Sequence, residues 1–145
     1  MWLCLPLFVK TVSGKGKAGL KQEENYYFFY LPVCYKGITG KSYAYYNTSR
    51  SKNLYLPASV DENYSYDIQL PENLTLCTPI QEKKIDNPIG SFKITLTSEG
   101  SSLHIELALQ IKKQLITPAE YPAFRSLITE WTDRTRKPIL FKTVQ

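Results

Sequence analysis

The 145-residue sequence predicts a mostly β fold: an antiparallel, immunoglobulin-like β-sandwich with one C-terminal α-helix followed by a short strand. Apolar and polar residues alternate over residues 63–70, 92–96 and 103–111, which is typical of strands with one buried face. Near the C-terminus the apolar residues change to helical spacing. This order, with many strands before a single late helix, argues against a parallel α/β fold.

The alternating segments give the clearest strand predictions. In the segment from Asn63 to Leu70, Tyr64 and Tyr66 share a face with aliphatic residues, so we expect both rings to face the core. Residues 91–113 hold two alternating runs joined by the polar sequence Ser98 to Ser102, which predicts a β-hairpin. Shorter strands are expected at Trp2–Val9, Asn25–Leu31, Lys41–Tyr46, Asn53–Leu56 and Ile139–Val144. The aromatic run Asn25–Leu31 is expected to form a strand that is covered on both faces or buried at its centre.

A capping box marks the expected start of the helix. Thr117 is placed at the N-cap, Pro118 at the first helical position, and Glu120 three residues after the cap. Pro122 is expected to disturb the first turn, because proline removes a backbone donor. The residues at helical spacing form one apolar stripe: Tyr121, Phe124, Leu127, Ile128 and Trp131. We therefore expect the helix to pack its stripe into the core.

The length suits a single β-sandwich domain over residues 1–145, which we interpret as a fragment of a longer protein. Residues 10–22 carry Gly14, Gly16 and Gly19 among lysines, which predicts a flexible loop or linker. The compact part is expected to begin after this stretch.

Charge and hydropathy argue against two classes of partner. The formal net charge is +5, but the basic residues do not gather on one helix, so no nucleic-acid partner is predicted. The apolar run Trp2–Val9 is too short to cross a bilayer, so no membrane span is predicted.

The residue inventory predicts that the chain is not an enzyme. Its one histidine, His104, falls on the polar face of its strand beside Glu106. Cys4, Cys34 and Cys77 are far apart and form no CxxC pair, so a zinc site is not expected, while one disulfide is left open. No motif for a phosphate or a dinucleotide occurs, and no cofactor is predicted. A catalytic role would require His104 beside both a cysteine and a carboxylate.

Eleven tyrosines support one alternative, a carbohydrate-binding β-sandwich module. Tyr43, Tyr45 and Tyr46 lie close to Lys41 and Asn47, a mixed aromatic and polar neighbourhood. Amphipathic rings suit both sugar stacking and protein interfaces. This alternative requires several tyrosines to be exposed together on one sheet face.

Four motifs carry a family resemblance: Asn53–Pro57 (NLYLP), Asp61–Pro71 (DENYSYDIQLP), Asn87–Phe92 (NPIGSF) and Thr117–Arg125 (TPAEYPAFR). In this order they resemble the C-terminal domain of bacterial multidomain proteins that contain a transglutaminase-like, cysteine protease-like domain. The resemblance covers about Asn25 to Phe141.

The resemblance implies a function and a location. It implies a non-catalytic accessory domain that packs against, or assists, a transglutaminase-like catalytic domain of the same polypeptide. The Cys, His and Asp triad of such proteins belongs to that catalytic domain, and no residue here matches it. An extracytoplasmic location in bacteria, periplasmic or secreted, is implied in the same way.

Overall fold

The computed structural model describes residues 20–33, 37–38 and 49–144. Its elements in chain order are β1 (Lys21–Glu23), β2 (Tyr26–Phe29), β3 (Leu54–Tyr55), β4 (Val60–Gln69), β5 (Leu74–Leu76), β6 (Gln81–Asn87), β7 (Gly90–Glu99), β8 (Ser102–Ile111), β9 (Leu115–Ile116), α2 (Tyr121–Arg136) and β10 (Ile139–Thr143). The fold is thus mostly β and antiparallel, with one C-terminal helix followed by a short strand, and the predicted fold class is confirmed. The expected strands Trp2–Val9 and Lys41–Tyr46 fall outside the described residues.

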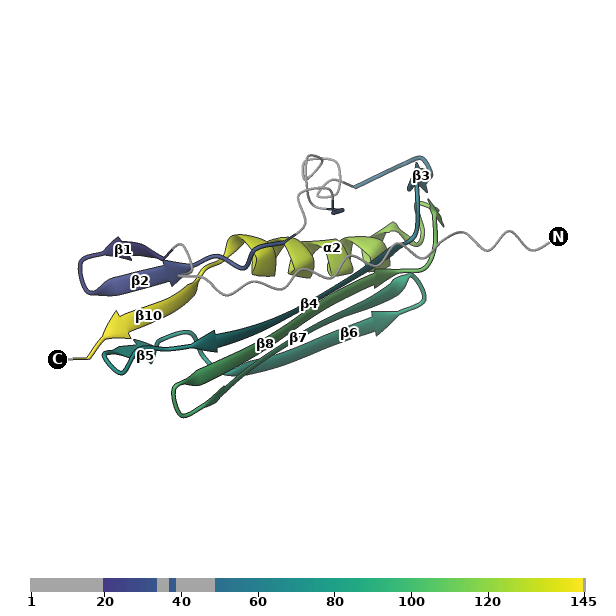
Figure 1. Ribbon diagram of the computed structural model, residues 1–145. Coiled ribbons are helices and arrows are strands. Elements are labelled where there is room, and N and C mark those ends of the chain that lie inside the picture. The colour runs from purple at the N-terminus through teal and green to yellow at the C-terminus, as the bar shows by residue number, and fades with distance from the viewer. Residues whose placement is uncertain (1–19, 34–36, 39–48, 145) are drawn as a thin grey trace.

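The described strands form three sheets. A long sheet has the strand order β4-β8-β7-β6, a terminal sheet has the order β1-β2-β10-β5, and β3 pairs with β9 in a two-stranded ribbon. The ribbon and the terminal sheet lie at opposite ends of the elongated molecule (Figure 1). Within the stretch expected to be a linker, Lys21 and Gln22 belong to β1.

The long sheet contains the predicted hairpin, with a shorter turn than expected. Glu99 pairs with Ser102, so only Gly100 and Ser101 form the loop, while Ser98 and Ser102 belong to strands. Gly100 has a φ of +57°, a value that glycine tolerates and two-residue hairpin turns require. At the other end of β7, Gly90 lies so close to the carbonyl of Gln110 that a Cβ would sit 1.8 Å from that oxygen.

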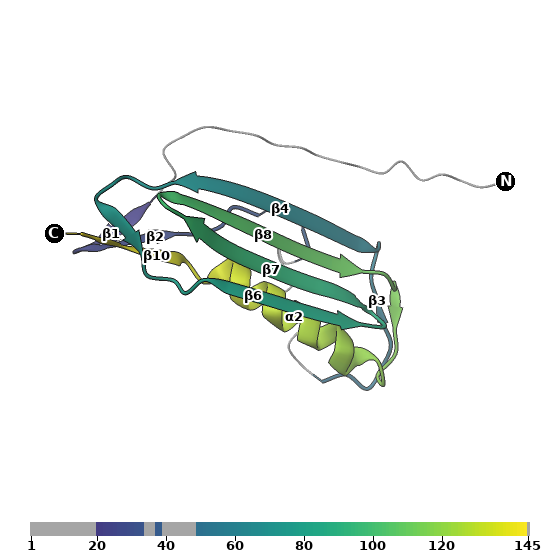
Figure 2. The same ribbon diagram turned by 90° about the horizontal axis from the view of Figure 1, so that it is seen from below.

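Helix α2 covers one face of the long sheet, here called the inner face (Figure 2). Leu and Ile side chains of β7 and β8 point at the helix and are almost fully buried. The whole predicted helical stripe is buried with them, and the Trp131 and Phe124 rings have no exposed surface. Beyond the C-terminal end of the helix, β10 and β2 continue the same layer (Figures 1 and 2). The helix therefore forms part of the second layer of the fold.

The helix begins later than the capping box predicts. Glu120 occupies the N-cap position without a side-chain cap bond, and Pro118 lies in a preceding turn. Thr117 and Glu120 still bond to each other, because Glu120 Oε2 accepts from the Thr117 amide at 3.1 Å. A start at Pro118 would require a helical hydrogen bond from Pro122, which has no N–H. With the start at Tyr121, Pro122 falls in the first turn, where no such bond is needed.

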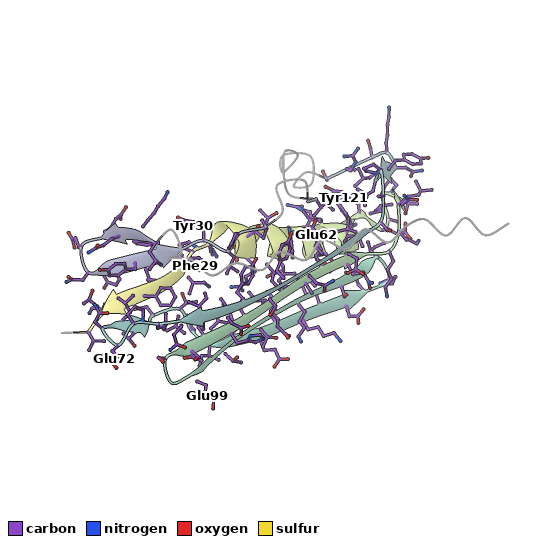
Figure 3. The ribbon with its side chains drawn as sticks, viewed as in Figure 1. Phe29, Tyr30, Glu62, Glu72, Glu99 and Tyr121 are labelled. Carbon is purple, nitrogen blue, oxygen red and sulfur yellow. The ribbon has the colours of Figure 1, made fainter. Side chains whose placement is uncertain are left out.

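Both edge strands of the long sheet carry one charged side chain on their inner face. On β4, Glu62 lies between the sheet and the layer of α2 (Figure 3) and accepts hydrogen bonds from the Ile38 amide at 2.8 Å and the Tyr64 hydroxyl at 2.9 Å. On β6, Lys83 donates to Glu130 of the helix at 2.5 Å. Each charge therefore has a partner within the described fold.

Candidate functional site

The outer face of the long sheet, opposite α2, is polar on all four strands. Its outward positions are Asp61, Asn63, Ser65, Asp67 and Gln69 on β4, Ser102, His104, Glu106, Ala108 and Gln110 on β8, Ser91, Lys93, Thr95, Thr97 and Glu99 on β7, and Glu82, Lys84 and Asp86 on β6. The expected place of His104, on the polar face beside Glu106, is confirmed.

A chain of charged contacts crosses this face through His104. Its Nδ1 lies 2.6 Å from Asp67 Oδ1, and its Nε2 lies 3.6 Å from Glu106 Oε1. Lys93 Nζ donates to the second oxygen of Glu106 at 3.1 Å. The antiparallel register causes this arrangement, because Asp67 is directly opposite His104 across β4 and β8.

These contacts shift two pKa values. The hydrogen bond with Asp67 raises the pKa of His104 above its ordinary value, since the carboxylate favours the protonated ring. The hydrogen bond from Lys93 lowers the pKa of Glu106. His104 is therefore held as part of an ion network on an exposed surface.

A histidine and a carboxylate are two parts of a nucleophilic site, and the third part is a nucleophile. In the described part of the chain, the one cysteine, Cys77, is exposed and lines a different depression from His104. The hydroxyl of Ser102 donates to the side-chain oxygen of Gln69. The described contacts of His104 are thus made with carboxylates.

Cys77 lines a groove of about 400 Å³ between the β5–β6 connection and the β7–β8 turn. The other walls of the groove include Leu70, Leu74, Ile80 and Ser98. Cys4 and Cys34 lie outside the described residues, so the open question of a disulfide concerns positions that the structure does not describe.

Residues 20–33, 37–38 and 49–144 offer neither a metal site nor a membrane-spanning helix. No three His, Cys, Asp or Glu side chains there are arranged to hold a metal ion. Helix α2, the helix in this part of the chain, lacks the length and apolarity that a bilayer crossing requires.

Two of the tyrosines are structural, as the alternation predicts. Tyr64 and Tyr66 face the layer of α2, with their rings stacked at a centroid distance of 6.3 Å, and Tyr64 also contacts the ring of Trp131. The Tyr66 hydroxyl donates to the carbonyl of Pro32 at 2.7 Å, and burial raises the pKa of Tyr66 to about 12. Tyr43, Tyr45 and Tyr46 fall outside the described residues.

The terminal sheet brings other aromatic residues together on its solvent side. Tyr26, Phe28 and Tyr30 occupy alternate positions of β2 and its extension, so they share one face, while Phe29 packs against the core (Figure 3). Tyr26 is 39% exposed and Tyr30 is 46% exposed. We call this surface the aromatic face. The expectation that Asn25–Leu31 is covered on both faces is wrong, because Tyr26 and Tyr30 are exposed on one face while Tyr27 and Phe29 pack against the core from the other. The centre of the run, Tyr27–Phe29, is half-buried.

Two lysines from the neighbouring strands flank the aromatic face. Lys21 of β1 lies 5.7 Å from the ring centroid of Tyr30, and Lys142 of β10 lies 6.0 Å from that of Tyr26. Both distances fall within the limit of about 6 Å for a cation–π contact. A strand made only of aromatic residues shows no period, so its sequence does not reveal which rings reach solvent. The available sequence signal is the neighbouring strand β1, because Lys21–Glu23 is polar throughout and so indicates a solvated edge of the sheet beside β2.

A second exposed apolar surface lies at the opposite end of the molecule. Tyr55 of β3 is paired with Leu115 of β9, and the two side chains are 71% and 42% exposed. The neighbouring pair, Leu54 and Ile116, points the other way and packs against the core. The ribbon is therefore held to the fold by one face, while its other apolar face is open to solvent.

The fold and these surfaces define a small, mostly β domain with two exposed aromatic surfaces and a histidine network bounded by carboxylates. Residues 25–141 match the family described as a domain of unknown function with a solved structure, DUF3858. The chain belongs to this family.

The chain is also similar to a solved structure from Parabacteroides distasonis that is described as a “putative protease”. The two chains share 32% identity with a TM-score of 0.72, over 83% of this chain and 24% of that chain. This chain therefore corresponds to about a quarter of the Parabacteroides protein. No curated protein matches it at a significant level. The expected resemblance to one domain of a larger, protease-like bacterial chain is confirmed at this level.

Proposed function

We propose that this DUF3858 domain is a non-catalytic accessory domain that packs against a transglutaminase-like catalytic domain of the same polypeptide. The observation that carries the proposal is the coverage of the similarity. At 32% identity the chain matches 24% of a larger protein described as a “putative protease”, so most of that protein lies outside the matched region. The transglutaminase-like character of the neighbour rests on the sequence resemblance.

The surroundings of His104 support the non-catalytic part of the proposal. Its two ring nitrogens contact Asp67 and Glu106, which are both acceptors, while Thr97, the hydroxyl residue opposite His104 on β7, has no described hydrogen bond to the ring. A general base must lie within hydrogen-bond reach of the proton it removes. The network therefore suits an ion-paired surface better than a site for acyl transfer.

The exposed pair Tyr55 and Leu115 is the surface that we assign to the catalytic domain. Tyrosine is enriched at protein interfaces, because it offers a large apolar area and a polar end. A neighbouring domain that covers this pair would also stabilise the two-stranded ribbon, which has two residues in each strand.

Hydrogen exchange in two polypeptides tests this contact. The first is the 145-residue chain, and the second is extended through the preceding domain of its parent protein. We expect slower exchange of the β3 and β9 amides in the extended polypeptide, with no change at the β7–β8 turn near Glu99, at the other end of the long sheet (Figure 3). Tyr55→Ser should abolish this slowing, whereas the matched variant Tyr30→Ser should leave it intact. Identical exchange of the ribbon in both polypeptides would refute this contact.

Activity assays test the non-catalytic part separately. We expect the 145-residue chain to show no casein cross-linking and no peptide cleavage above background. His104→Ala provides the control for a contaminating enzyme. Activity in the wild type that is lost in His104→Ala would overturn the proposal.

The same proposal places the polypeptide outside the bacterial cytoplasm, and this part rests on the family resemblance alone. Fractionation of cells that produce the full-length protein should recover it with periplasmic or secreted markers. Recovery with cytoplasmic markers would contradict the location without affecting the domain contact.

A further inference from the structure

We propose that the aromatic face of the terminal sheet binds an acidic polysaccharide, with sugar rings stacked on Tyr26 and Tyr30 and sugar carboxylates held by Lys21 and Lys142. This inference concerns a different surface from the domain contact above, and it does not depend on the proposed function. It rests on the arrangement of three aromatic residues and two lysines at one end of the molecule.

The spacing of the rings suits a linear ligand. Tyr26, Phe28 and Tyr30 follow one another at every second position, so neighbouring side chains are about 7 Å apart along the strand. The next strands add Leu140 beside Phe28 and Thr75 beside Lys142. These residues form an extended row of rings with flanking polar groups. A chain-like ligand requires such an open row and could not enter an enclosed pocket.

The exposed fractions of Tyr26 and Tyr30 show that their rings reach solvent, and the lysine contacts show that the ring faces attract positive charge. Lys21 and Lys142 approach the faces of Tyr30 and Tyr26, where the ring quadrupole is negative. The C–H groups on the flat side of a pyranose ring carry partial positive charge and can stack on the same faces. A bound sugar would displace each lysine ammonium group from the tyrosine ring. The displaced ammonium group could then donate hydrogen bonds to the hydroxyl or carboxylate groups of the sugar.

The charge of this surface selects the class of sugar. Two lysines flank the row, one on each side of β2, and one carboxylate, Glu23 of β1, lies opposite Tyr26, so the two lysines outnumber it. The outer face of the long sheet, in contrast, carries carboxylates on each of its four strands. A uronic acid supplies both a pyranose ring for stacking and a carboxylate for the lysines. A neutral glycan would use only the rings.

A pair of matched ligands tests the proposal directly. The 145-residue chain is titrated by calorimetry and by NMR with an oligogalacturonate and with its methyl ester, which has the same rings and linkages without the charge. We expect the oligogalacturonate to bind several-fold more tightly at low salt, and the difference to shrink as salt screens the lysines. Signals of β2 and β10 should shift, while those of β3 and β9 should not.

Three variants separate stacking from charge. Tyr30→Ala should weaken binding of both ligands by about tenfold, as expected for one lost stacking contact. Lys142→Gln should weaken oligogalacturonate by about threefold and leave the ester unchanged. Tyr55→Ala, which removes an even more exposed tyrosine at the other end of the molecule, should change neither affinity.

Four outcomes would overturn the proposal. Three concern the ligands: no binding of either ligand, equal affinity for the acid and the ester, or a loss of affinity in Tyr55→Ala equal to that in Tyr30→Ala. The fourth is slowed amide exchange of β2 in the extended polypeptide, which would assign the aromatic face to the neighbouring domain. None of the first three bears on the ribbon contact, so the two proposals can fail independently.

Discussion

The long sheet and the terminal sheet present different surfaces to solvent. The outer face of the long sheet is made of hydroxyl, amide and charged side chains, and Ala108 is its one aliphatic member among the described residues. The outer face of the terminal sheet has aromatic residues on three alternate positions: Tyr26 and Phe28 of β2, and Tyr30 just after the strand. Both sheets have four strands and one covered face, so sheet architecture does not explain the difference.

The comparison separates residues that the fold requires from residues that it does not. A solvated sheet face is satisfied by polar residues, as the long sheet shows. Large rings that are exposed together exceed what a solvated face needs and indicate a binding surface. The long sheet therefore serves mainly as the frame of the domain, and the terminal sheet and the ribbon carry its candidate contacts.

The sharpest test of this difference compares two phenylalanines. Phe124 has no exposed surface, and Phe124→Ala should lower the free energy of unfolding by about 3–5 kcal/mol. Phe28 is half-buried on the aromatic face and is outside the core cluster, so Phe28→Ala should cost less than about 1 kcal/mol. Chemical denaturation measures both. Equal costs would show that the aromatic face is part of the core.

A second test probes the rigidity of the long sheet through its glycines. Gly90→Ala would drive a Cβ into the Gln110 carbonyl and should cost about 1–3 kcal/mol, because neither strand can move without breaking the ladder. Gly100→Ala meets no neighbour and strains only the positive φ, which should cost about 1 kcal/mol. Thermal unfolding of the two variants gives the comparison. A larger cost at Gly100 would mean that the strands separate readily at Gly90.

The smallest expected effect is the titration of His104 on the polar face. Its folded pKa is raised, so the protonated ring stabilises the fold. This contribution is fully present below the unfolded pKa of about 6.5 and is lost as pH rises through the folded value. NMR titration should show a lower pKa for His104 in Asp67→Asn than in the wild type. An unchanged pKa would mean that Asp67 does not hold the ring in solution.

The sequence predicts the frame of this fold well, because its signals are local. Strict alternation in residues 103–111 places every second side chain on the inner face, and the structure follows it without exception. The apolar stripe of the helix, which ends at Trp131, is predicted by its spacing in the same way and is buried throughout. The strand β6 is not predicted by the sequence, because QEKKIDN is polar except for Ile85 and shows no apolar alternation.

The candidate surfaces were harder to predict, because they depend on contacts between distant residues. Lys142 reaches Tyr26 only through the pairing of β10 with β2, and no local pattern contains that pairing. The exposed pair of Tyr55 and Leu115 likewise needs two segments 60 residues apart. The sequence points to Tyr43, Tyr45 and Tyr46 because they lie among polar residues, whereas the continuous aromatic run around Tyr26 and Tyr30 is typical of a covered strand.

The inward charges on the two edges of the long sheet bear on the solubility of the protein. An edge strand of ten residues, such as β4, is a template on which another chain can add a strand and start aggregation. A second chain adding to β4 would bring its own side chains against Glu62, and one adding to β6 would meet Lys83. Both charged side chains have partners in the monomer. If a second molecule extended the sheet, these side chains would lose their partners or their contact with water. They therefore protect the monomer from edge-to-edge association.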